Sequence, residues 1–109
     1  MRIIKKHLGV MALISALLAA TCVLSSQAKA DAAAGQTTFK AKCAGCHGAD
    51  GTGKEALKTT DLGAADIQNK ADADLSASIS SGKGKMPAFK TLTADQVKDL
   101  VAFIRSLKK

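Results

Sequence analysis

Tryptophan and tyrosine are missing from the sequence, and its only aromatic side chains are those of Phe39, Phe89 and Phe103. A core built around several large aromatic residues is therefore excluded. The chain has 109 residues, enough for one small domain, and 79 of them lie beyond residue 30. Domains as small as 79 residues often need a disulfide, a metal or a cofactor for stability. The composition therefore suggests that something other than protein supplies part of the core.

Regular alternation of apolar and polar residues is also absent, and neither an internal repeat nor a low-complexity block follows residue 30. A strand with one buried face needs such alternation over several residues. Sheet architectures and repeat proteins are therefore excluded. The sequence instead predicts short helices joined by loops, and we expect an all-α fold.

Four helices are predicted after residue 30, at about 32–44, 64–69, 72–80 and from Thr93 onward. A loop with several glycines, 45–60, separates the first two. The last helix has the clearest signals, because Thr93 and Gln96 fit a capping box. Its apolar residues also recur at helical spacing. They are Val97, Leu100, Val101, Ile104 and Leu107.

Residues 31–109 carry too little net positive charge to predict a strongly basic surface. The whole chain has a formal net charge of +7, with 16 Lys and Arg against 9 Asp and Glu. Arg2, Lys5, Lys6 and Lys29 lie within the first 30 positions, so residues 31–109 carry a net charge of only +3. Nucleic-acid recognition calls for a stronger and more clustered basic surface. We therefore expect no nucleic-acid partner.

The first 30 residues have the three-part layout of a secretory signal peptide. A basic start precedes an apolar run at 8–24, and small residues follow up to Ala30. We predict cleavage between Ala30 and Asp31, which leaves 79 residues in the periplasm or another exported location. In the alternative, residues 8–24 are retained as a membrane anchor. This apolar run is slightly short for that role, because a spanning helix needs roughly 20 apolar residues.

The segment Cys43-Ala44-Gly45-Cys46-His47 fits the Cys-x-x-Cys-His signature of covalent haem attachment. Residues three apart lie on one face of a helical turn, so both sulfur atoms can reach one edge of a porphyrin. The imidazole of the next residue then turns towards the iron. We predict that Cys43 and Cys46 bind one haem c through two thioethers and that His47 is an axial ligand.

Other chemistry is open to a Cys-x-x-Cys pair, which can form a disulfide, a thiol redox pair or half of a zinc site. A zinc site needs further ligands, and the remaining candidates, His7 and Cys22, lie in the predicted signal peptide. A thioredoxin-like protein would show a βαβ pattern, which the sequence lacks. The adjacent histidine favours haem attachment.

Met86 is the candidate for the second axial ligand. The other two methionines, Met1 and Met11, lie in the predicted signal peptide. Pro87 restricts the backbone next to Met86, which suits a side chain that must stay in one position. A His/Met pair raises the reduction potential and leaves no open position on the iron. The alternative is that Met86 is a core residue and the iron is open or differently ligated.

Over nearly all of residues 31–109 the sequence resembles class I cytochrome c, especially the small bacterial monohaem members. Residues 43–48 match the family's haem-binding motif, and residues 84–89 are similar to its methionine loop. Gly35 and Phe39 resemble the glycine and the aromatic residue where the family's first and last helices cross. The resemblance implies a small cytochrome c fold, with short helices wrapped around one haem, and single-electron transfer between redox proteins.

The sequence departs from the family pattern after the haem motif. Many members have a proline there whose carbonyl accepts a hydrogen bond from the ligand histidine, and Pro87 is the only proline here. We expect a backbone carbonyl between Leu57 and Leu62 to take its place, because a ligand imidazole needs a partner to fix its orientation. The lack of tryptophan leaves the contacts of the haem propionates open.

The favoured function is that of a mobile electron carrier, not an enzyme. Lysines that flank the two haem-binding segments either steer an acidic redox partner or are ordinary surface residues. They are Lys40, Lys42, Lys54, Lys83, Lys85 and Lys90. Two alternatives stay open. One is an open-coordinate haem enzyme or gas sensor, and the other is a membrane-anchored cytochrome subunit of an oxidase.

Overall fold

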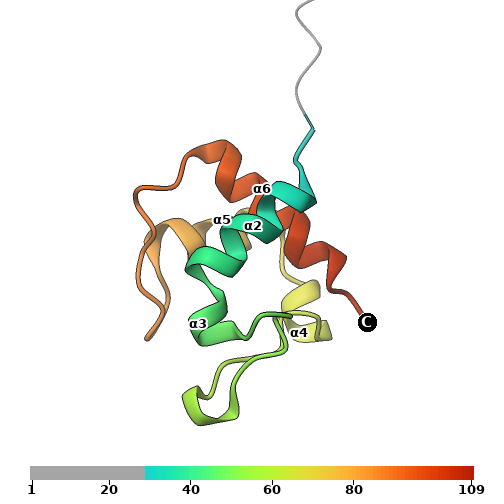
Figure 1. The fold of residues 1–109 in the computed structure, drawn as a ribbon, viewed down its shortest axis with the longest axis vertical. Helices are drawn as coiled ribbons and strands as arrows, with labels where there is room; N and C mark the ends of the chain where they lie inside the picture. The colour runs from blue at the N-terminus through green and yellow to red at the C-terminus, as the bar shows by residue number, and fades with distance from the viewer. Residues whose placement is uncertain (1–28) are drawn as a thin grey trace, which may run out of the picture.

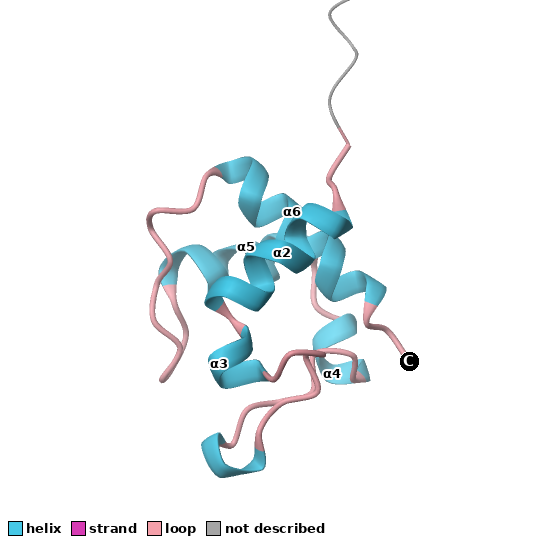
Figure 2. Ribbon diagram, in the orientation of Figure 1, coloured by secondary structure: helices cyan, strands magenta, loops and turns pink. Residues whose placement is uncertain are grey.

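The computed structural model describes residues 29–109, and the structural statements below concern those residues. The predicted signal peptide lies outside them except for its last two residues, so its cleavage stays a prediction. The described chain forms five α-helices and one short 3-10 helix (Figures 1 and 2). In order these are α2 (Ala32–Lys42), α3 (Ala44–His47), η1 (Glu55–Leu57), α4 (Ala65–Gln68), α5 (Asp72–Ser81) and α6 (Ala94–Ser106).

The prediction of an all-α fold is confirmed. Long loops join the helices, and the one β-type pairing among the described residues is an isolated bridge between Lys83 and Met86. Figure 2 shows how large a share of the chain these loops take. None of the described helices is both long and apolar enough to cross a membrane.

The first predicted helix divides at Cys43 into two helices. α2 ends at Lys42, and α3 continues from Ala44 to His47, where the sequence predicted a loop beginning at Gly45. That boundary was wrong because the carbonyl of Cys43 accepts hydrogen bonds from the amides of Cys46 and His47, at 3.2 and 3.0 Å. These bonds close a helical turn despite the glycine, so the whole cysteine–histidine motif lies on helical backbone.

The crossing of α2 and α6 forms the centre of the fold (Figure 1). A Cβ atom added to Gly35 would lie 2.0 Å from the carbonyl oxygen of Asp99, so the backbones approach as closely as only glycine permits. Phe39 is almost completely buried, and its ring centroid lies 5.0 Å from that of Phe103. The expected roles of Gly35 and Phe39 at a helix crossing are therefore confirmed.

Helix α6 begins as the sequence predicts. The hydroxyl of Thr93 accepts a hydrogen bond from the amide of Gln96 at 3.1 Å, and the Gln96 side chain accepts one from the Thr93 amide at 2.9 Å. This capping box satisfies amides that the first turn leaves without helical partners. The buried face of α6 packs against α2 and α5, and it comprises Val97, Leu100, Val101, Phe103 and Ile104.

Candidate functional site

The two cysteines lie one turn apart at the start of α3. Cys43 is the cap residue of both α2 and α3, and its amide donates to the carbonyl of Phe39 at 2.8 Å. Its thiol is half-buried, that of Cys46 is exposed, and the two are not joined in a disulfide. Within the described chain, therefore, both sulfur atoms are available on one helical segment.

A loop after α3 holds the carbonyl groups of this segment. The Thr59 hydroxyl donates to the Cys46 carbonyl at 2.7 Å, and the Lys54 ammonium donates to the Gly45 carbonyl at 2.9 Å. The amide of Gly53 donates to the carbonyl of His47, also at 2.7 Å. Three carbonyls that end a short helix thus find partners. The loop thereby fixes the direction in which the motif's side chains point.

The imidazole of His47 has a buried nitrogen, Nδ1, that no described residue satisfies by a hydrogen bond. The expectation that a carbonyl between Leu57 and Leu62 would take this role is wrong. In this loop the Thr59 carbonyl faces the backbone of Gly53 instead, since a Cβ on Gly53 would lie 2.4 Å from it. Buried imidazole nitrogens usually have a hydrogen-bond partner, so His47 departs from that pattern among the described residues.

Burial shifts the pKa values of two groups in the motif. It lowers the pKa of His47 below its ordinary value, which favours the neutral imidazole that binds metals. It raises the pKa of the Cys43 thiol, and the positive charge of Lys42 opposes that shift. Both residues therefore face an environment that disfavours charge.

Met86 lies in the loop between α5 and α6. Lys83 and Met86 exchange two backbone hydrogen bonds, at 3.1 and 3.0 Å, and the amide of Phe89 donates to the carbonyl of Ile79 at 2.9 Å. Gly82, which has a positive φ of 79°, gives the loop its sharp exit from α5. These contacts hold the half-buried Met86 on the inner side of the loop.

Two cavities meet between these segments, and Cys43, His47 and Met86 line both of them. The core-side cavity has a volume of about 370 Å³ and the loop-side cavity about 410 Å³. The rest of the core-side lining is Phe39, Thr60, Leu62, Asp66, Ile67, Lys70, Leu75, Ser78, Ile79, Lys83, Leu100 and Ile104. The rest of the loop-side lining is Lys42, Cys46, Leu57, Thr59, Lys85, Pro87 and Phe89.

The residues of this site fit a haem. The two cavities are large enough for a cofactor and mostly apolar, as a porphyrin requires. The side chains that line the cavities include two thiols, an imidazole and a thioether. Imidazole and thioether are the axial ligands of haem iron in cytochromes c, and two thiols at Cys-x-x-Cys-His spacing are the signature of covalent attachment. A small helical fold with this site defines a c-type cytochrome.

Comparison with known proteins agrees with that class. Residues 30–104 match the family described as cytochrome c oxidase, cbb3-type, subunit III, and the chain belongs to this family. It is 41% identical over 78 residues to cytochrome c6 of Rippkaea orientalis (strain PCC 8801 / RF-1), a match covering 68% of each chain. It is 38% identical over 77 residues to cytochrome c6 of Leptolyngbya boryana, with 69% of this chain and 91% of the relative covered.

Solved structures show the same likeness. The KustC0563 c-type cytochrome matches with a TM-score of 0.61 and 28% identity, covering 69% of this chain and 98% of that one. Cytochrome cL of Methylophaga aminisulfidivorans matches with a TM-score of 0.60 and 29% identity, and the match covers 71% of this chain and 53% of that one. The chain is therefore a small monohaem c-type cytochrome, and it is a cytochrome c6-like electron carrier, not an enzyme.

Several predictions about the site are confirmed at the level of the class. The cytochrome c fold, the electron-carrier function and a covalently held haem follow from the family, and the Cys43–Cys46 pair is consistent with that haem. The individual roles of Cys43, Cys46, His47 and Met86 stay predictions. Most of the cavity lining was not predicted.

Proposed function

We propose that residues 31–109 carry one haem c, attached to Cys43 and Cys46, with His47 and Met86 as the axial ligands of its iron. The observation that carries this proposal is that Cys43, His47 and Met86, from two distant segments of the chain, line the same two cavities. When bound, the haem supplies one-electron chemistry through its ferric and ferrous states. We further propose that residues 1–30 are removed on export.

The contribution of the chain is to fix the backbone of both ligand residues. His47 is held through its carbonyl by the Gly53 amide, and Met86 is held by the paired hydrogen bonds with Lys83. Ligands that keep their positions in both oxidation states make the rearrangement that accompanies electron transfer small. The mostly apolar lining keeps water from competing with the methionine sulfur. These features suit a carrier that takes up and releases electrons quickly.

A docking face for redox partners is proposed around the loop-side cavity. Lys42 and Lys85 line this cavity, and Leu57 beside them is 51% exposed although it is a large apolar residue. An apolar patch with lysines around it is complementary to an acidic partner, whose approach the positive charge would accelerate. Electron transfer to an acidic redox protein should slow as salt rises. A rate that does not depend on salt would contradict this docking mode.

The haem itself can be tested on the exported, purified protein. A pyridine haemochrome spectrum identifies a haem with two thioether bonds, and the intact mass gives the number of haems and the first residue. We expect one haem on a chain that begins at Asp31. A colourless protein with two free thiols would refute the proposed haem attachment.

The ligand role of Met86 is tested by Met86→Ala. The wild-type ferric protein should show the weak far-red band of sulfur–iron ligation and should bind carbon monoxide slowly when reduced. The variant should lose the band, bind carbon monoxide rapidly and have a lower reduction potential, because His/Met ligation raises it. Lys85→Gln, one residue away, is the control and should keep the band. A wild type that lacks the band and binds carbon monoxide rapidly would favour a gas-binding site instead.

The family match favours a second candidate. Residues 30–104 match a family described as an oxidase subunit. In this case the haem would deliver electrons within a membrane-bound oxidase, and residues 8–24 would be retained as an anchor. Cell fractionation together with the intact mass separates the two candidates, because a retained anchor gives the mass of the longer chain in the membrane fraction.

A further inference from the structure

One lysine of the core-side cavity differs from the other charged residues that line it. Lys70, Asp66 and Lys83 contribute charged side chains to a lining that is otherwise mostly apolar. Asp66 and Lys83 are exposed, whereas Lys70 is half-buried. The ion pairs formed by the described residues are Arg105–Asp72 and Lys109–Asp61, so neither includes Lys70. A lysine whose side chain lines an apolar cavity is best accommodated where its ammonium group can meet an opposite charge.

The backbone at Lys70 is held in place by hydrogen bonds from Arg105 on α6. The Arg105 guanidinium on α6 donates to the carbonyl of Lys70 at 2.5 Å and to the carbonyl of Gln68 at 2.8 Å. The same group forms an ion pair with Asp72 at 2.8 Å. The amide of Lys70 donates to the carbonyl of Ile67 at 3.1 Å. This stretch of chain is therefore rigid at both peptide groups, and it holds the lysine at the cavity.

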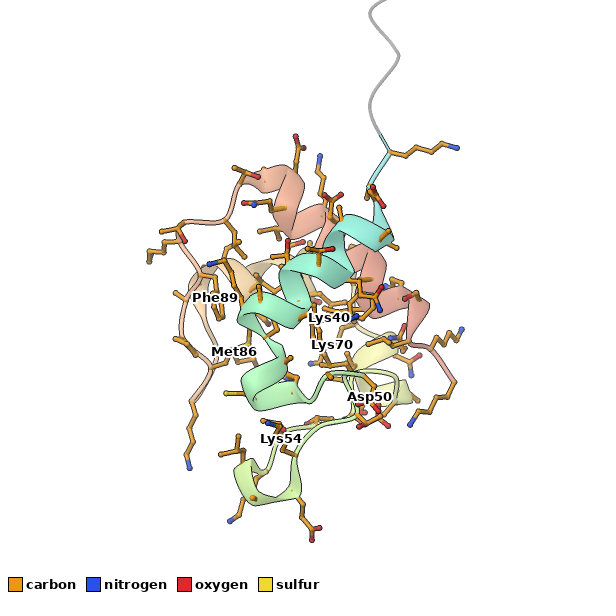
Figure 3. All side chains as sticks on the ribbon, viewed as in Figure 1. Lys40, Asp50, Lys54, Lys70, Met86 and Phe89 are labelled. Carbon is orange, nitrogen blue, oxygen red and sulfur yellow. The ribbon has the colours of Figure 1, made fainter. Side chains whose placement is uncertain are left out.

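Lys70 and Cys43 line the same cavity, and the only anionic groups of a haem are its two propionates. The vinyl groups that form thioethers and the two propionate groups lie on opposite halves of the porphyrin. Cys43 comes from the segment that joins α2 to α3, whereas Lys70 follows α4, so two distant segments contribute these residues to the core-side cavity. In Figure 3, Lys70 is drawn between α2 and α4, apart from Met86 and Phe89 of the loop after α5.

We propose that Lys70 is the cationic partner of a haem propionate and that its charge raises the reduction potential of the iron. This inference rests on the haem attachment proposed above. A carboxylate near the iron favours the ferric state, which carries one more positive charge than the ferrous state. A lysine paired with that carboxylate offsets its charge and so favours the ferrous state. Because the pair is partly buried, salt screens it less than an exposed pair.

The test is a redox titration of the purified haem protein carrying Lys70→Gln. The equilibrium constant for its reduction by a mediator should fall about tenfold, which corresponds to a potential about 59 mV lower for a one-electron couple. The shift should persist at high salt. Lys98→Gln is the matched control, since Lys98 is exposed on α6 and lines neither cavity, and it should leave the potential unchanged.

Two further variants separate the charge from other effects. Lys70→Arg keeps the charge and should keep the potential, so an equal fall in both Lys70 variants would indicate a structural role and overturn the inference. Lys83→Gln tests the other lysine of the lining, and a shift there without one in Lys70→Gln would also overturn it. Wild-type protein without haem would refute the proposed function as well. A haem-bearing wild type whose potential Lys70→Gln does not change would refute only the role of Lys70.

Discussion

At the scale of single residues, Gly35 shows how one missing side chain determines a helix crossing. Gly35→Ala places a Cβ atom 2.0 Å from the carbonyl oxygen of Asp99, and backbone on both sides leaves little room to relax. Overpacking of this kind costs about 1–3 kcal/mol. We therefore expect the free energy of unfolding of the haem protein to fall by about that amount, measured by denaturant titration.

Gly45→Ala is the control for this substitution. Apart from its chain neighbours and the backbone of its own helix, no described atom lies within 4 Å of a Cβ at Gly45, and this glycine also lies in a helix. The free energy of unfolding of the Gly45→Ala variant should therefore differ little from that of the wild type. An equal loss in the two variants would mean that close packing at the α2–α6 crossing is not the cause.

Residues differ in how far the sequence alone could identify them. Cys43, Cys46 and His47 are recognisable because their chemistry depends on spacing along one helical turn, which is written directly in the sequence. Lys70 could not be singled out, because its significance depends on a cavity formed by several distant segments and on the bonds that Arg105 makes to its backbone. Functional residues that lie close together in the sequence form a recognisable pattern. Residues that only tertiary packing brings to a site leave no such pattern.

At the scale of elements, the C-terminal end of the chain is tied to the loop before α4. Lys109 forms an ion pair with Asp61, and the other carboxylate oxygen of Asp61 accepts from the Gly63 amide at 2.8 Å. The hydrogen bond from Lys109 and then that from Gly63 hold the pKa of Asp61 below its ordinary value. A carboxyl group whose pKa is lower in the folded state stabilises the fold above its unfolded pKa, and this contribution is lost as pH falls.

Asp61→Asn tests this link between the tail and the loop. At pH 7 the variant should be less stable than the wild type, because the charged partner of Lys109 is lost. Below about pH 4, where an aspartate in an unfolded chain takes up its proton, the difference should shrink progressively. Denaturant titrations at both pH values measure it, with the exposed Glu55→Gln as control. A difference that is the same at both pH values would show that the charge of Asp61 is not responsible.

The elements also differ in how well the sequence predicts them. Helix α6 was predicted correctly because its cap and its apolar spacing are local and agree with each other. The boundary at Cys43 was not, because a glycine suggested a loop where the Cys43 carbonyl closes a further helical turn. The partner of the His47 imidazole was also mispredicted, since the course of the 48–60 loop depends on packing of several glycines rather than on local propensity.

At the scale of the whole molecule, the haem cavity and the hydrophobic core share their residues. Leu75, Ile79, Leu100 and Ile104 belong to the buried core and also line the core-side cavity. A cavity of about 370 Å³ that stayed empty would cost at most about 9 kcal/mol, at about 24 cal/mol per Å³. The total stability expected of 79 residues is about 4–12 kcal/mol. The two quantities are of the same size, so we expect the fold to depend on the cofactor.

The double variant Cys43→Ala/Cys46→Ala therefore should not fold as the haem protein does. Without thioether bonds the chain has no covalent hold on the haem, and the core residues that line the cavity would meet water. We expect far-ultraviolet circular dichroism to show much less helix than in the haem protein, and urea titration to show no cooperative transition. The haem protein, handled in parallel, should unfold cooperatively. A haem-free variant with full helix content and a sharp urea transition would contradict this prediction. It would mean that α2, α5 and α6 form a stable core without the cofactor.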